Sequence, residues 1–97
     1  MADNISVLGV WNVVTKAVAY TARNHDCVLV DASLGTIAIT LPTEAANVYV
    51  DVKKTDSSAN AVTVSGVGTI DGAASLSIST QYYSYTLICD GTNWHIV

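Results

Sequence analysis

The sequence VYVDVK, residues 48–53, places a valine at every second position and a polar or aromatic residue between the valines. A period of two is typical of a β-strand that has one buried face. The same alternation recurs in residues 28–30, 37–41, 62–65, 75–79, 83–89 and 94–96. The apolar positions are mostly Val, Ile, Leu or Tyr, which suit a half-buried pleated surface. The pattern therefore predicts an all-β chain.

Turn-forming sequences separate these predicted strands. Asp71-Gly72 and Asp90-Gly91 are flanked by alternating segments, which is a strong signal of a β-hairpin. Pro42 ends another predicted strand, because proline cannot donate to the hydrogen-bond ladder. About seven or eight short strands joined by such turns predict a single-domain antiparallel β-sandwich or a jelly-roll-like module.

The first 17 residues follow a different pattern, because their apolar side chains have no clear period. We interpret residues 1–17 as an apolar N-terminal arm and residues 18–97 as the β-sandwich domain. The arm is either a strand buried on both sides or a segment packed onto a neighbouring subunit. In the second case the predicted subunit contacts are Val7, Leu8, Val10, Trp11, Val13 and Val14.

The composition favours a protein that buries its surface in an assembly. Hydrophobic residues make up 51% of the 97 residues and charged residues only 12%. A single small domain with so little charge is expected to expose apolar surface that a partner covers. The net charge is −4 and only four residues are basic, so nucleic acid is not an expected partner.

No segment predicts a membrane span or a secretion signal. Asn12 and Lys16 interrupt the apolar N-terminal run, and the first residues lack a positively charged region. We therefore expect no membrane partner and assembly in a host cytoplasm. In that reducing compartment Cys27 and Cys89 are expected to be small buried side chains, and whether they ever pair stays open.

From about Tyr20 to Val97 the chain resembles virion structural proteins of tailed bacteriophages, in tail fibres, head fibres and small capsid decoration proteins. The ordered set of motifs carries the resemblance. The motifs are Val28-Leu29-Val30-Asp31-Ala32-Ser33, Ile37-Ala38-Ile39-Thr40-Leu41-Pro42, residues 52–60, Thr69-Ile70-Asp71-Gly72 and residues 87–97. Members of this group look like β-rich modules that assemble as trimers.

The resemblance implies a virion structural protein on the capsid surface. A free-standing module with an apolar arm favours a capsid cement or decoration protein, which would stabilise the phage head as a homotrimer bound to the major capsid protein. The alternative is a tail-fibre or receptor-binding module that recognises host-surface glycans. In that case Tyr82 is the expected glycan contact, because Tyr83 and Tyr85 alternate with Leu87 and are expected in the core or an interface.

The residue inventory predicts no enzyme and no cofactor. His25 and His95 are the only histidines, and neither has a neighbouring nucleophile in the sequence. No spacing of histidine, cysteine or aspartate matches a zinc or calcium site. Asp51 and Asp56 could meet across a bend, but we interpret both as ordinary strand and turn residues.

Overall fold

A computed structural model describes residues 11–97, and within that range it contains nine β-strands and no helix. The strands are β1 (Asn12–Lys16), β2 (Tyr20–Thr21), β3 (Asp26–Val30), β4 (Ile37–Thr40), β5 (Tyr49–Lys54), β6 (Val62–Ser65), β7 (Leu76–Ile78), β8 (Ser84–Cys89) and β9 (Trp94–Ile96). The prediction of an all-β fold is confirmed.

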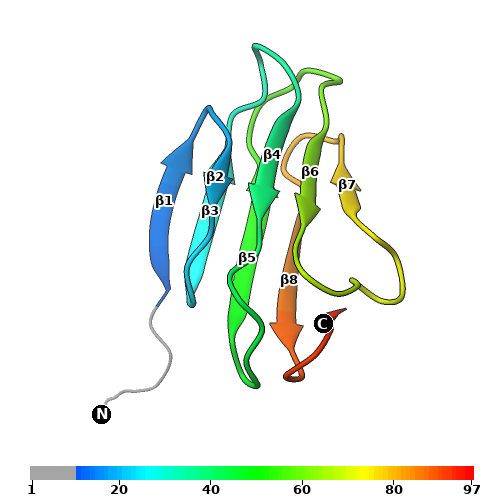
Figure 1. Cartoon of the computed structure of the whole chain (residues 1–97). Coiled ribbons are helices and arrows are strands. Elements are labelled where there is room, and N and C mark those ends of the chain that lie inside the picture. Colours follow the sequence, from blue (N-terminus) through cyan, green and yellow to red (C-terminus); the bar gives the residue numbers. More distant parts are fainter. Residues whose placement is uncertain (1–10) are drawn as a thin grey trace.

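The strands form two sheets in two layers (Figure 1). The larger sheet has five strands in the order β1-β3-β5-β8-β9, and the smaller has four in the order β2-β4-β6-β7. From β1 to β6 the chain changes sheet at every connection, so that consecutive strands belong to different layers. Two facing sheets of this kind are compatible with a sandwich.

Strand direction differs from the prediction. Pairing is parallel for β1–β3, β3–β5, β2–β4 and β4–β6, and antiparallel only for β5–β8, β6–β7 and β8–β9. The antiparallel prediction is therefore wrong for the first six strands, and a jelly roll, which is built from antiparallel Greek keys, does not describe this order. The reason is that alternation reveals a buried face but not the direction of the neighbouring strand. A strand in the opposite sheet serves here as the crossover that a parallel pair requires.

The two Asp-Gly signals do form tight turns. Asp71 and Gly72 have φ angles of 47° and 83°, and the flanking Ile70 and Ala73 exchange two backbone hydrogen bonds of 2.8 and 2.9 Å. Positive φ at both central residues is the geometry of a type I′ hairpin turn. Asp90-Gly91 lies in the connection between β8 and β9, which pair as an antiparallel hairpin.

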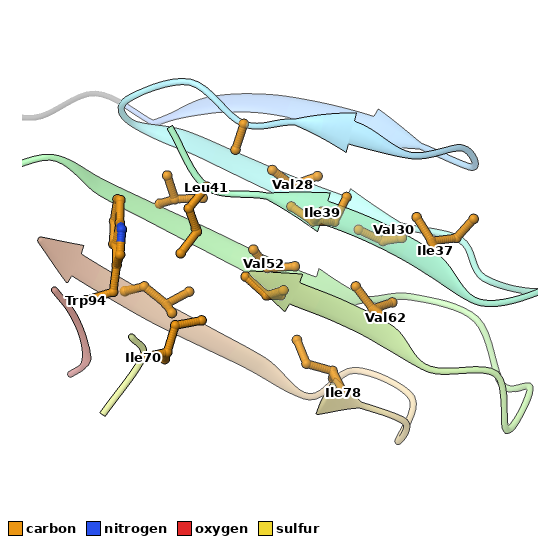
Figure 2. Close-up of a cluster of buried hydrophobic side chains, with 14 of the residues drawn as sticks. Val28, Val30, Ile37, Ile39, Leu41, Val52, Val62, Ile70, Ile78 and Trp94 are labelled. Atoms are coloured by element: carbon orange, nitrogen blue, oxygen red, sulfur yellow. The ribbon is translucent and has the colours of Figure 1, made fainter. Parts of the chain in front are cut away.

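The hydrophobic core lies between the two sheets (Figure 2). Val28, Val30 and Val52 enter it from the larger sheet, and Ile37, Ile39 and Val62 enter it from the smaller one. Trp94 on the short β9 is fully buried at one end of this layer. The alternating apolar positions of the sequence are thus the inward-facing ones.

The described part of the predicted arm is an edge strand. Asn12–Lys16 form β1, which pairs in parallel with β3 along its whole length. It is not buried on both sides, because the Val13 side chain is 63% exposed. Residues 1–10 lie outside the described range, so the neighbour contacts predicted for Val7, Leu8 and Val10 stay predictions.

Candidate functional site

The outer edge of β1 carries backbone groups that β3 does not use. The Asn12 amide donates to the His25 carbonyl at 2.9 Å, and the Lys16 carbonyl accepts from the Asp31 amide at 2.9 Å. The backbone groups of successive residues in a strand point to opposite sides, so the even-numbered residues of β1 face β3. Val13 and Thr15 therefore direct their N–H and C=O groups away from the sheet.

The opposite edge of the same sheet is closed by another part of the chain. The Trp94 amide on β9 donates to the Thr69 carbonyl at 2.8 Å, and the Asp71 amide donates to the Trp94 carbonyl at 3.0 Å. A short parallel bridge between Ile70 and Trp94 accompanies these bonds. Among the described strands, β1 is therefore the long open edge of the larger sheet.

A buried carboxylate anchors the start of β1. Asp26 is fully buried and accepts hydrogen bonds from the Asn12 side-chain amide at 2.9 Å, the Tyr20 hydroxyl at 2.7 Å and the Arg23 backbone amide at 2.9 Å. Burial alone raises the pKa of Asp26, but these hydrogen bonds outweigh burial and lower it. The same hydrogen bond raises the pKa of Tyr20. Asp26 thus links β1 and β2 to β3 and holds the open edge in place.

An aromatic cluster lies beside the same edge. The Trp11 ring meets the Tyr49 ring edge to face at 5.0 Å, and the His25 ring lies 4.3 Å from Tyr49 on a tilted plane. Trp11 remains 40% exposed and Val18, just beyond β1, is 67% exposed. Val14 faces the interior and packs against the core. The structure therefore brings the predicted contact residues Trp11, Val13 and Val14 to one edge.

Tyr82 lies at a second exposed position, in the turn before β8. Its φ angle is 68°, its side chain is 62% exposed and the Lys53 ammonium lies 5.4 Å from its ring centre. Left-handed backbone costs a bulky residue about 1–2 kcal/mol, and such strain is found preferentially at functional sites. Tyr85 packs against the core as predicted, whereas Tyr83 is exposed and is not a core residue.

The strained turn is held by a buried lysine. The Tyr82 amide donates to the Lys54 carbonyl at 2.7 Å, and the Lys54 amide donates to the Tyr83 carbonyl at 3.1 Å. The Lys54 side chain is fully buried, and its ammonium donates to Asp56 Oδ2 at 2.8 Å and to Ser58 Oγ at 3.2 Å. The turn therefore rests on an ion pair inside the protein.

Asp56 connects this ion pair to the neighbouring loop. Its carboxylate accepts the Ala32 amide at 2.7 Å and the Ser58 amide at 3.0 Å, and it also contacts the Ser58 hydroxyl. The Asn60 side-chain amide donates to the Ala32 carbonyl at 2.8 Å. The hydrogen bond from Lys54, followed by that from Ser58, holds the pKa of Asp56 well below its ordinary 3.8. The two connections after β3 and β5 are thus fastened together.

These carboxylates predict acid sensitivity. The pKa of Asp56 is lowered as described, and hydrogen bonds from the Asn93 amide, His95 and the Thr92 amide lower that of Asp90 to about 2. A carboxyl whose pKa is lower in the folded state contributes stability above its unfolded pKa and loses it as the pH falls through its folded pKa. We expect the melting temperature to drop as the pH falls from about 4 to about 2. Thermal unfolding of wild type and Asp56→Asn over this range measures it, and identical pH profiles would contradict a contribution from Asp56.

The remaining sequence candidates do not converge on one centre. Cys27 faces outward in register with Asp51 whereas Cys89 faces the core, and both are free thiols. Burial raises the pKa of Cys27. Asp51 accepts a hydrogen bond from Thr86 at 3.0 Å and so has its own partner, separate from the partners of Asp56. His95 lies between Asp90, at 2.8 Å, and Asp71, at 3.7 Å, on the exposed surface.

The part of the chain that the structure describes contains no group of side chains spaced to hold a metal ion and no enclosed pocket. Residues 11–97 likewise contain no helix capable of crossing a membrane.

Sequence reasoning missed the buried Lys54 and Asp26. The signal was present, because Lys54 continues the inward series Val48, Val50 and Val52, and Asp26 precedes Val28 by two residues. Charged residues are rarely fully buried unless they are paired, which makes an exposed position the usual assumption. Their partners come from distant or non-periodic positions, so the alternation alone could not identify them.

Comparison with known proteins adds no relative. No protein-family model and no curated protein matches this chain.

Proposed function

We propose that this chain is a structural protein of a tailed-bacteriophage particle, a capsid cement or decoration protein that stabilises the head as a homotrimer. In this proposal the two-sheet body is a β-sandwich module bound to the major capsid protein on the capsid surface. The contacts between subunits come from Val7, Leu8, Val10, Trp11, Val13 and Val14.

The observation that carries the proposal is the open β1 edge. Residues 11–15 contain no charged side chain, and Trp11 and Val13 are exposed there. Exposed edge strands in isolated proteins are usually protected by charge, proline or a covering segment, because unpaired backbone groups recruit other strands. An uncharged apolar edge supports a role in assembly. Burial of apolar surface stabilises such contacts by about 25 cal/mol per Å² before the costs of association.

Immunogold electron microscopy of intact particles, with an antibody against this chain, tests the location. Gold over the head is the expected result and supports a decoration protein. Gold at the tail tip or on fibres would overturn that location and favour the second candidate. Comparing the thermal stability of particles with and without the protein tests its stabilising role directly.

The second candidate is a tail-fibre or receptor-binding module that recognises host-surface glycans, and the strained, exposed Tyr82 favours it. Aromatic rings offer a broad apolar face with a polar tip, which suits a partly apolar ligand such as a sugar ring. The Lys53 ammonium near the same ring adds a positive charge. A glycan array with the intact protein tests this candidate, and binding that Tyr82→Gly abolishes is the expected result for a glycan contact.

The backbone strain at Tyr82 makes its own prediction. We expect Tyr82→Gly to raise the free energy of unfolding by about 1 kcal/mol, because glycine adopts positive φ without the steric cost, partly offset by its unfolded-state entropy. Tyr83→Gly is the matched control, since Tyr83 is equally exposed but does not have positive φ, and it is expected to bring no gain. Chemical denaturation measures both variants, and a loss of stability in Tyr82→Gly would contradict the strain.

A further inference from the structure

The open groups on β1 specify the kind of partner that fits them. Val13 and Thr15 direct backbone donors and acceptors away from β3, as the hydrogen bonds of Asn12 and Lys16 require. Such a row of groups is satisfied by another extended strand, which adds to the sheet edge. The edge carries no charge over residues 11–15, and the Lys16 ammonium is turned toward the Tyr20 ring at 4.4 Å. Two copies of this edge therefore do not repel each other.

We propose that β1 pairs with β1 of a second copy in an antiparallel, two-fold arrangement centred on Val14. This deepens the self-assembly in the proposed function and rests on it, but it concerns a contact made in pairs. Joined to a trimer, it links β1 of one trimer to β1 of the next. In the absence of a trimer, it gives a dimer.

The register follows from which residues point outward. With Val14 opposite Val14 of the second copy, each Val13 faces a Thr15, and those residues exchange about four backbone hydrogen bonds. The two Val14 side chains then form a non-hydrogen-bonded pair, in which side chains lie closest together. Val14 is only partly buried and packs against the core, so a second Val14 completes its burial. Asn12 lies opposite Lys16, so polar residues face polar residues.

The two-fold symmetry is favoured by the edges available within residues 11–97. A head-to-tail sheet would need a second open edge of similar length, but the β9 edge is covered by Thr69–Asp71. In the smaller sheet the edge strands are the two-residue β2 and the three-residue β7. An edge that pairs with itself closes after two copies and needs no other surface.

Val13→Pro in the full chain tests the pairing. Proline at residue 13 removes an amide that points away from β3, so the ladder inside the sheet is retained while the outer edge is blocked. Light scattering across a concentration series is expected to show that the variant halves the mass of the wild-type species, from dimer to monomer or from hexamer to trimer. Val13→Lys introduces an edge charge without proline and is expected to have the same effect. Val18→Lys, beyond the strand, is the matched control and is expected to keep the wild-type mass.

Cysteine cross-linking tests the register. Val14→Cys is expected to give a disulfide-linked pair on a non-reducing gel, whereas Val13→Cys, which lies opposite Thr15, gives little. Wild type, with Cys27 and Cys89 alone, is the background. A wild-type monomer at every concentration, or a mass that Val13→Pro and Val13→Lys leave unchanged, overturns the pairing. A cross-link through Val13→Cys in place of Val14→Cys overturns the register. Head labelling of particles combined with either result would leave the proposed function standing and remove only this contact.

Discussion

Lys54→Met is expected to lower the free energy of unfolding by about 3–5 kcal/mol, because it leaves Asp56 without the partner that balances its charge. The Lys54 side chain is fully buried, and its ammonium lies 2.8 Å from Asp56 Oδ2. Methionine keeps most of the length and apolar stem of lysine, so the loss reports the charge and its hydrogen bonds. For a domain of this size the melting temperature shifts by about 4–8 °C per kcal/mol. Urea denaturation followed by far-ultraviolet circular dichroism measures the change.

The double variant Lys54→Met, Asp56→Asn separates the ion pair from simple packing. Removing both charges leaves no unpaired carboxylate, so the double variant is expected to be more stable than the sum of the two single losses predicts. Lys53→Met is the matched control, because Lys53 is the neighbouring lysine on the outward face of β5. A loss with Lys53→Met equal to that with Lys54→Met, or strict additivity in the double variant, would contradict a specific buried pair.

Trp94→Ala is expected to cost about 3–5 kcal/mol, since it empties the largest fully buried side chain of the core. The residue lies on β9, which is only three residues long and gains much of its hold from this ring and from the bonds to Thr69 and Asp71. We expect the end of the larger sheet to loosen together with the turn at Asp71. Equilibrium unfolding measures the cost, and amide hydrogen exchange measures the loosening of β9.

Trp11→Ala supplies the matched control for the same chemical change. Trp11 is 40% exposed and contacts Tyr49 only at the rim, so its removal is expected to cost about 1 kcal/mol or less. The Trp94 indole nitrogen is buried without a hydrogen-bond partner among the described residues, so Trp94→Phe is expected to cost less than Trp94→Ala. Equal losses for Trp94→Ala and Trp11→Ala would show that β9 does not depend on its buried ring.

Local sequence patterns predict the strands and their faces well. The series Val48, Val50 and Val52, continued over other segments, identifies the inward positions because side chains in any strand alternate at a fixed period. The tight turn at Asp71-Gly72 is also local, since positive φ at two successive positions is accessible mainly to such residues. Both features depend on neighbours within a few residues.

Strand direction and the buried charges could not be predicted in the same way. The parallel pairing of β3 with β5 depends on how residues 31–48 cross to the other sheet and return, and nothing in either strand encodes that path. Lys54 and Asp56 are two residues apart, yet their pair is completed by Ala32 from a different connection. The strain at Tyr82 likewise arises because Lys54 fixes the turn from across the ladder.

The sequence by itself determined an all-β chain, the inward faces of its strands and its low charge, because each of these follows from side-chain type and a period of two. Only the tertiary structure decided that the first six strands alternate between two sheets in parallel register, that β1 is an open edge while β9 is covered, and that Lys54 lies inside. Those properties depend on contacts between residues far apart in the chain, where the pairing energy of whole sheets outweighs any local preference.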